Sequence, residues 1–157
     1  MASRRRARLY ALQALYAADV HLRLNSQGIR HQKRQQLEYF WDTQENDGLE
    51  WMGGRLAEED EKVFAHYLFD GVCENYADIN RQIEEVANNW SLERMAVVDL
   101  NIIRLAAFEL MFCQENIPAR VTLNEAIEIA KKYSVKEASR FVNGILDKIS
   151  AKHRQRT

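Results

Sequence analysis

Proline occurs only once in the 157 residues, at Pro118, and this scarcity constrains the fold more than any other feature of the sequence. Proline interrupts helices and glycine weakens them, and the chain has only six glycines. Long stretches therefore run without a break, which favours long helices over many short strands. No segment shows the alternation of apolar and polar residues that is typical of a half-buried strand. We expect an all-α fold with about seven helices, in one domain over residues 1–157.

Apolar residues recur at helical spacing along most of the chain, and this periodicity predicts where the helices lie. In the first helix the apolar residues cover a wide arc, which predicts a helix that is packed on more than one side. The last helix carries an apolar stripe formed by Ala138, Phe141, Val142, Ile145, Leu146 and Ile149. The predicted helices cover about 4–24, 57–76, 78–88, 91–112, 122–134 and 135–152.

Three predicted helices begin at residues that commonly cap helices. Ser91 precedes the most apolar stretch of the chain and is expected to cap it. Thr122 and Glu125 match the capping box T-x-x-E, and Ser134 and Glu137 match S-x-x-E. Both boxes predict a helix N-terminus.

Residues 25–56 are the least regular part of the sequence. They can form an amphipathic helix whose apolar face holds Ile29, Leu37, Phe40 and Trp41, followed by a glycine-containing loop. At the other end of the chain, residues 153–157 are predicted to form a basic tail.

Charge is strongly segregated although the formal net charge is only −1. Residues 1–40 hold 8 Lys/Arg and 2 Asp/Glu, residues 41–99 hold 4 and 15, and residues 100–157 hold 10 and 6. Two basic terminal segments therefore flank an acidic middle. If the two ends meet in the fold, they would form one basic face, which suits a different partner from the acidic middle.

The sequence gives no sign of enzyme chemistry. It has no glycine-rich phosphate loop, no HExxH and no GxSxG motif, and its four histidines are scattered. Cys73 and Cys113 are predicted to be reduced core residues rather than a disulfide or metal ligands. The acids of "AEEDEK" at residues 57–62 are better explained as a solvated helix start than as metal ligands. No cofactor is expected, and the lack of a signal peptide or membrane-spanning run indicates a cytoplasmic protein.

An arginine cluster opens the chain and runs directly into the first helix. Cations oppose the positive end of the helix dipole, and a folded core has no use for such a cluster. We therefore expect a reason outside the fold, which is either a solubilising tail or a nucleic-acid contact. The cluster consists of Arg4, Arg5, Arg6 and Arg8.

A second basic set lies around the start of the last helix. Cations neutralise phosphates and aromatic rings stack on unpaired bases, so this mixture suits single-stranded RNA. Phe141 also fits the apolar stripe and can face either RNA or the core. Gly144 costs stability in mid-helix, and either close helix packing or close approach of a ligand backbone explains it. The set consists of Lys131, Lys132, Lys136 and Arg140, together with the aromatic residues Tyr133 and Phe141.

Three blocks of the sequence resemble the NusB family of bacterial transcription antitermination factors. The blocks read "RRRARLYALQALYA", "LNIIRLAAFEL" and "LNEAIEIAKKYSVKEASRFVNGILDKI", and the resemblance covers roughly residues 1–24 and 57–152. It implies two packed helical bundles and a non-catalytic role. That role is the binding of single-stranded boxA RNA in nascent transcripts together with NusE, a small-subunit ribosomal protein, within the RNA polymerase antitermination complex. Promotion of ribosomal RNA transcription is implied as well.

The resemblance also implies roles for individual residues. Glu137 stands where the family has an aspartate and Ser139 where a histidine can occur, and Glu137 also has its capping-box explanation. The implied RNA contacts are Arg4, Arg5, Arg6, Arg8, Glu137, Arg140 and Phe141, and the implied NusE contacts are Tyr16 and Asp99.

Two alternative functions remain at this point. The first is a helical module or homodimer that binds only protein, with the basic ends meeting an acidic partner. The second is an appendage of an enzyme, since similar helical domains precede RNA cytosine methyltransferases, although this sequence contains no cofactor-binding domain.

Overall fold

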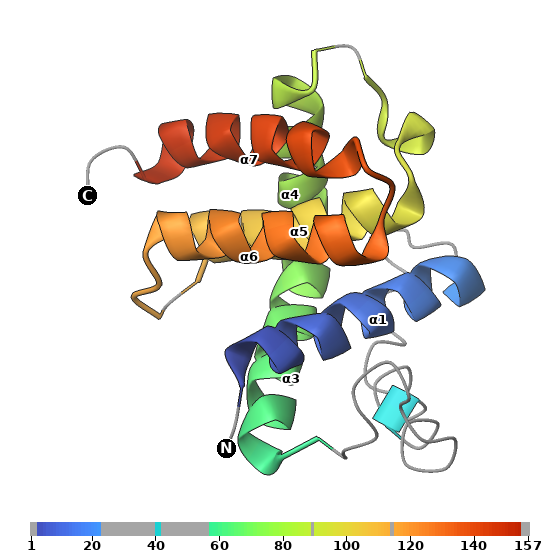
Figure 1. Cartoon of the computed structure of the whole chain (residues 1–157), viewed down its shortest axis with the longest axis vertical. Helices are drawn as coiled ribbons and strands as arrows, with labels where there is room; N and C mark the ends of the chain where they lie inside the picture. Colours follow the sequence, from blue (N-terminus) through green and yellow to red (C-terminus); the bar gives the residue numbers. More distant parts are fainter. Residues whose placement is uncertain (1–2, 23–39, 42–56, 89, 114, 155–157) are drawn as a thin grey trace. The chain divides into compact units, whose positions relative to one another are not determined.

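The computed structural model describes residues 3–22, 40–41, 57–88, 90–113 and 115–154 (Figure 1). Within these residues all regular secondary structure is helical, as the sequence predicts, and six α-helices are present where about seven are expected. Of the segment 25–56 only Phe40 and Trp41 are described, so most of the helix predicted there lies outside the described residues. The elements are α1 (Arg4–Leu22), α3 (Glu59–Glu74), α4 (Tyr76–Val86), the 3-10 turn η2 (Leu92–Arg94), α5 (Val97–Met111), α6 (Ala119–Tyr133) and α7 (Ala138–Arg154).

The chain divides into two compact units, Met1–Cys73 and Glu74–Thr157. The first holds α1 and nearly all of α3, and the second holds α4 to α7. Both cysteines are free thiols, Cys73 buried and Cys113 half-buried, so the two do not form a disulfide. None of the helices in the described ranges is both long and apolar enough to cross a membrane.

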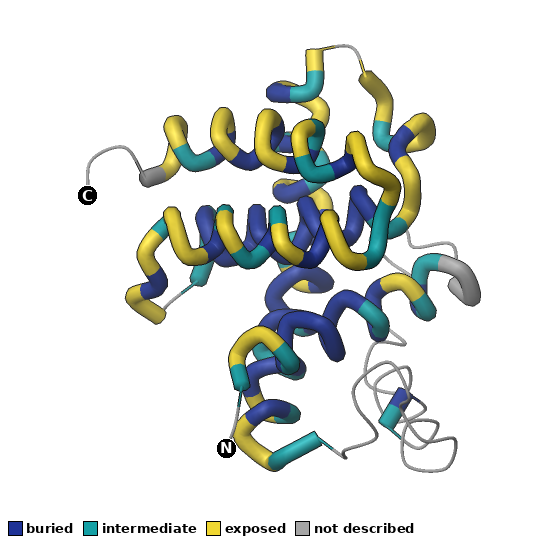
Figure 2. Tube along the Cα trace, viewed as in Figure 1, coloured by how far each residue is buried: buried dark blue, intermediate teal, exposed yellow. Residues whose placement is uncertain are grey.

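Helix α5 lies at the centre of the second unit. Every residue from Asp99 to Leu110 is buried, and α6 and α7 pack against α5 and against each other (Figures 1 and 2). A helix that is apolar nearly all round must be covered on several sides, and the neighbouring helices provide this cover.

Two buried polar side chains of α5, Arg104 and Glu109, have partners on neighbouring helices of the unit. Arg104 Nε donates to Asn80 Oδ1 at 2.9 Å, and its guanidinium lies 4.7 Å from the ring centroid of Tyr76. Glu109 accepts a hydrogen bond from Thr122 Oγ1 at 3.0 Å. Buried polar groups are costly unless they are paired, so these contacts fix the register of α5 against α4 and α6.

Helix α7 confirms the predicted apolar stripe, because its buried and exposed residues alternate with the helical period (Figure 2). Phe141 is half-buried, so its side chain is neither fully in the core nor fully accessible to RNA. Gly144 is exposed, and an added Cβ would meet no described atom within 4 Å. The packing explanation of this glycine is therefore wrong. The buried residues of the stripe are Ala138, Val142, Ile145, Leu146 and Ile149.

The predicted helix starts are wrong in three places. Helix α6 begins three residues before Thr122, after Pro118, whose fixed backbone angle suits a helix entry. Thr122 is therefore inside the helix and bonds Glu109 instead of capping. Ser91 precedes η2 rather than α5 and makes no side-chain cap. Ser134 Oγ donates to Asp99 Oδ1 at 2.5 Å instead of serving as the predicted cap.

Helix α1 is buried over a wide arc, as predicted. The helical spacing of Leu9, Leu12, Tyr16 and Val20 in the sequence predicts a buried apolar stripe, but Tyr16 departs from it, because it is 43% exposed. The side chains of Val20 and Leu22 lie outside the described residues. The buried apolar residues of the helix are Ala7, Leu9, Tyr10, Ala11, Leu12, Ala14, Leu15 and Ala18.

An aromatic cluster in the first unit contains a half-buried histidine that contacts a tryptophan. Trp41 Nε1 donates a hydrogen bond to His66 Nε2, and the two rings are stacked with centroids 5.6 Å apart. The Tyr10 ring packs edge-on against Trp41 at 5.3 Å. Since the indole nitrogen is only a donor, His66 must accept at Nε2 and is therefore neutral in this arrangement.

Burial lowers the pKa of His66, with a smaller opposing effect from Asp70 and a further lowering by Lys62. The folded state thus binds the proton less readily than the unfolded state, whose pKa is near 6.5. Stability from this site is complete above about pH 6.5 and declines as the pH falls toward the folded pKa. We expect urea denaturation to show a lower free energy of unfolding at acidic than at neutral pH. His66→Phe should reduce this dependence, because it removes the group that titrates. An unchanged pH dependence in His66→Phe would contradict the assignment.

Candidate nucleic-acid interface

The four arginines at the start of α1 differ in their surroundings. Arg4 and Arg5 are exposed, Arg6 is half-buried, and Arg8 is only 5% exposed. The cluster is therefore continuous with an ordered helix rather than a loose tail. Its first two members face solvent, and the other two belong largely to the packed part of the unit.

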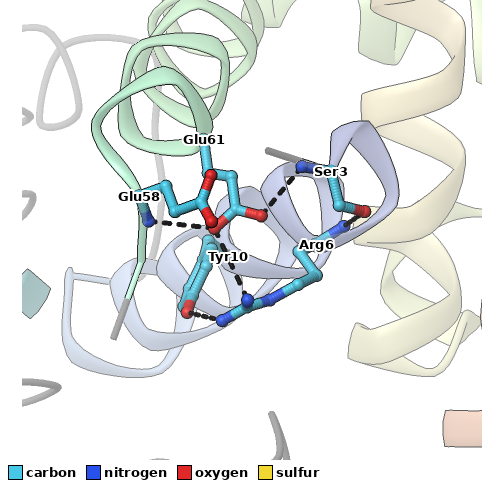
Figure 3. Close-up of polar contacts among 5 residues, drawn as sticks. All are labelled: Ser3, Arg6, Tyr10, Glu58 and Glu61. Atoms are coloured by element: carbon cyan, nitrogen blue, oxygen red, sulfur yellow. Dashed lines mark hydrogen bonds and ion pairs between the residues drawn. The ribbon is translucent and has the colours of Figure 1, made fainter. Parts of the chain in front are cut away.

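Arg6 meets a buried carboxylate supplied by α3 (Figure 3). Its Nη1 lies 3.7 Å from Glu61 Oε1, and its Nη2 donates to the hydroxyl of Tyr10 at 3.0 Å. The same carboxylate accepts the backbone N–H of Ser3 at 2.9 Å and that of Glu58 at 3.0 Å. The expectation that a folded core has no use for the cluster is thus wrong, because Arg6 takes part in the junction of two helix starts.

The acidic segment at 57–62 also differs from its prediction. Glu59 and Asp60 are exposed, as a solvated helix start requires, but Glu61 is only 1% exposed. Among the described residues, no group of three or more His, Cys, Asp or Glu side chains is arranged to hold a metal ion.

Phe64, one turn after Glu61 on α3, contacts two further arginines. The guanidinium carbon of Arg4 lies 3.9 Å from the centroid of the Phe64 ring, and that of Arg8 lies 5.7 Å from it. Phe64 itself is buried. Cations are attracted to the face of an aromatic ring, so Phe64 holds the side chains of Arg4 and Arg8 close to α3.

The second basic set lies where α6 ends and α7 begins, in the second unit. Glu137 and Arg140 are exposed, and the half-buried Phe141 lies beside them in sequence. Lys132 lies 5.4 Å from the ring centroid of the half-buried Tyr133. This turn therefore presents cations and partly accessible rings together, as the sequence predicts. Its exposed cations are Lys131, Lys132, Lys136 and Arg140.

The two residues that the resemblance assigns to a protein partner lie in different environments. Tyr16 is exposed on α1 in the first unit. Asp99 is 7% exposed in the first turn of α5, where a carboxylate suits the helix dipole, and Ser134 donates to it. Asp99 is thus largely enclosed within its own unit, and only a small part of it is accessible.

Glu61 and Phe64 were not predicted as site residues. One hint in the sequence is that Ser3 has the position of a helix cap while the residue three places later is Arg6 instead of a glutamate. The N–H of Ser3 therefore needs another acceptor, but the pattern does not identify Glu61 as that acceptor. No comparable signal identifies Phe64.

Comparison with known proteins decides the family. The NusB family model matches residues 5–151. The chain belongs to the NusB family. A transcription antitermination protein NusB from Geotalea uraniireducens is 46% identical over 151 residues, which cover 96% of each chain. NusB of Trichlorobacter lovleyi is 45% identical, over 96% of this chain and 92% of the relative. These relatives are antitermination factors rather than enzymes.

Solved structures support the same family. A structure of NusB from T. maritima matches with a TM-score of 0.74 and 34% identity, over 98% of this chain and 94% of the other. A crystal structure of the antitermination factors NusB and NusE in complex with double-stranded RNA matches with a TM-score of 0.72 and 26% identity. That match covers 95% of this chain and 96% of the other. The all-α fold of the NusB family is therefore the fold of this chain.

Proposed function

We propose that this chain binds single-stranded boxA RNA in nascent transcripts together with NusE. In the RNA polymerase antitermination complex it would suppress termination and promote transcription of ribosomal RNA in the cytoplasm. One observation carries the proposal. Arg4 and Arg5 are exposed on the first turn of α1, and this turn is held in place by its contacts with α3. Arginines at fixed positions bind phosphates with less loss of conformational entropy than arginines on a flexible tail.

The RNA contacts are divided between the two basic sets. Arg4 and Arg5 contact phosphates directly, and Arg6 and Arg8 contribute mainly by adding positive charge beneath them. At the start of α7, Arg140 contacts phosphate, Phe141 offers the exposed part of its ring to a base, and Glu137 accepts hydrogen bonds from base amino groups.

Gly144 lies on the exposed face of α7, one turn after Arg140, and has open space where a Cβ would stand. Its lack of a side chain would let the RNA backbone approach the helix closely, which is the remaining explanation of this glycine.

The contacts with NusE involve Tyr16 and Asp99. An exposed tyrosine presents an apolar ring and a hydroxyl, a combination that is enriched in protein interfaces. Asp99 has the position of a helix-start carboxylate that can accept one further hydrogen bond from a partner.

A titration of labelled RNA tests the proposal. Three ligands are compared with and without NusE: single-stranded boxA RNA, a scrambled strand of the same composition, and the boxA duplex. We expect the single boxA strand to bind most tightly, NusE to increase its affinity, and the affinity to fall with salt at a log–log slope of about −0.7 per phosphate contact.

Three results would contradict this function. Equal affinity for the boxA and scrambled strands would exclude sequence recognition. Nuclease-insensitive binding of NusE by a chain that binds no RNA would instead favour the protein-binding module. Tighter binding of the duplex would exclude single-stranded RNA as the ligand.

A further inference from the structure

We propose that Glu61 is a positioning residue for RNA binding, which holds the first turn of α1 so that Arg4 and Arg5 are presented to the ligand. Glu61 itself is buried and does not reach solvent, so it cannot be an RNA contact. The inference rests on the proposed function, since it concerns how the same arginines bind.

The N-terminal cap of α1 lacks the acid of a complete capping box. Ser3 is the capping residue, because its carbonyl oxygen accepts the N–H of Ala7 at 3.0 Å and its hydroxyl accepts the N–H of Arg6 at 3.2 Å. In a capping box, a glutamate at the position of Arg6 would accept the N–H of the capping residue. Here the carboxylate of Glu61, 58 residues further along the chain, accepts that N–H instead (Figure 3).

The same carboxylate of Glu61 also completes the N-terminal cap of α3. The carbonyl oxygen of Glu58 accepts the N–H of Lys62 at 3.0 Å, so Glu58 is the capping residue of α3. The N–H of Glu58 in turn donates to Glu61 Oε1. One oxygen of Glu61 thus serves α3 and the other serves α1, and the carboxylate cannot rotate without breaking one of the two bonds.

The carboxylate of Glu61 also compensates the positive charge at the N-terminus of α1. Arginines at a helix N-terminus oppose the helix dipole, whereas a carboxylate there is favourable. Because Glu61 supplies that carboxylate from another helix, the first turn of α1 can carry arginines at every position except Ala7. Arg4 also rests on the ring of Phe64, so α3 holds this turn through two side chains.

Simple electrostatics and positioning make opposite predictions for the removal of this acid. If charge alone matters, Glu61→Gln removes a negative charge near the RNA and binding becomes tighter. If Glu61 positions the turn, binding becomes weaker, because a glutamine places an NH2 donor where one of the two carboxylate oxygens accepts, so that one of the two backbone N–H groups loses its acceptor. Glu59→Gln is the matched control, since it removes the same charge from an exposed site two residues away.

The experiment measures the affinity of the full chain and of both variants for the single boxA strand over a range of salt concentrations. We expect Glu61→Gln to bind about three- to tenfold more weakly, at an unchanged salt slope, because the phosphate contacts survive and only their ordering cost rises. Glu59→Gln should bind at least as tightly as the unchanged chain. Equal or tighter binding by Glu61→Gln, or an equal loss in both variants, would overturn the proposal.

Hydrogen exchange separates this inference from folding and from the proposed function. In Glu61→Gln we expect faster exchange of the amides of residues 6–8, with unchanged exchange in the middle of α1 around Leu15. Phe64→Leu, which keeps an apolar side chain but removes the ring under Arg4, should also weaken RNA binding. If the unchanged chain binds no RNA, the proposed function fails, and unchanged exchange at residues 6–8 would overturn the positioning role as well.

Discussion

Replacing Arg4 and Arg5 together with alanine is expected to weaken the binding of single-stranded RNA about 25-fold at 0.1 M salt. Each phosphate contact to a single strand contributes about 0.7 to the log–log salt slope, so the loss of two contacts makes the slope shallower by about 1.4. Both side chains are exposed, although Arg4 also lies over the ring of Phe64. RNA titrations over a salt series measure the slope directly, and thermal unfolding measures any stability that is lost with the contact between Arg4 and Phe64.

A matched variant controls for the change in net charge. Arg94 and Arg120 are also exposed, and their double replacement removes the same two charges from other parts of the surface. We expect this variant to keep a salt slope close to that of the unchanged chain. If both double variants lose the same affinity and slope, general attraction rather than contact by Arg4 and Arg5 accounts for RNA binding.

Leu146→Ala is expected to lower the free energy of unfolding by about 3–5 kcal/mol. Leu146 is fully buried on α7, the helix that packs against α4, α5 and α6 within the second unit. Truncation removes apolar surface and leaves a cavity that close-packed neighbours fill only in part. At about 2–4 °C per kcal/mol for a chain of this length, the melting temperature should fall by roughly 6–20 °C. Urea denaturation followed by circular dichroism measures both the loss and any change in cooperativity.

Asp147→Ala gives the comparison at the neighbouring position. Asp147 is exposed, so its replacement should change the free energy of unfolding by no more than about 0.5 kcal/mol. A loss below about 1 kcal/mol in Leu146→Ala would show that α7 is less tightly packed than its burial indicates.

Where apolar residues have a clear helical period, the fold could be predicted from the sequence alone. The stripe of α7 is the best example, because each buried position follows from the spacing of Val142, Ile145 and Ile149. The start of α6 could not be predicted in this way. Thr122 has the right residue type and spacing for a cap, but the buried carboxylate of Glu109 offers its hydroxyl a better partner. A local sequence pattern cannot reveal a hydrogen-bond partner that another helix supplies in the folded chain.

The candidate site shows the same limit. The arginine cluster could be found by counting charges, and the resemblance supplied its ligand. The difference between the exposed Arg4 and the buried Arg8 could not be found, because it depends on which parts of the folded unit cover each residue, and no local sequence pattern encodes that cover. Gly144 was recognised as unusual, but only the open space around it removed the packing explanation.

The bond between Ser3 and Glu61 has a consequence during synthesis of the chain. When the first residues leave the ribosome, the acid that completes the cap of α1 has not yet been made. Elongation by a further 58 residues takes about 3–12 s at about 5–20 residues per second. Until then the N–H of Ser3 can bond only to water or to a temporary partner. The cap of the arginine-bearing turn can thus be completed only after the start of α3 has emerged from the ribosome.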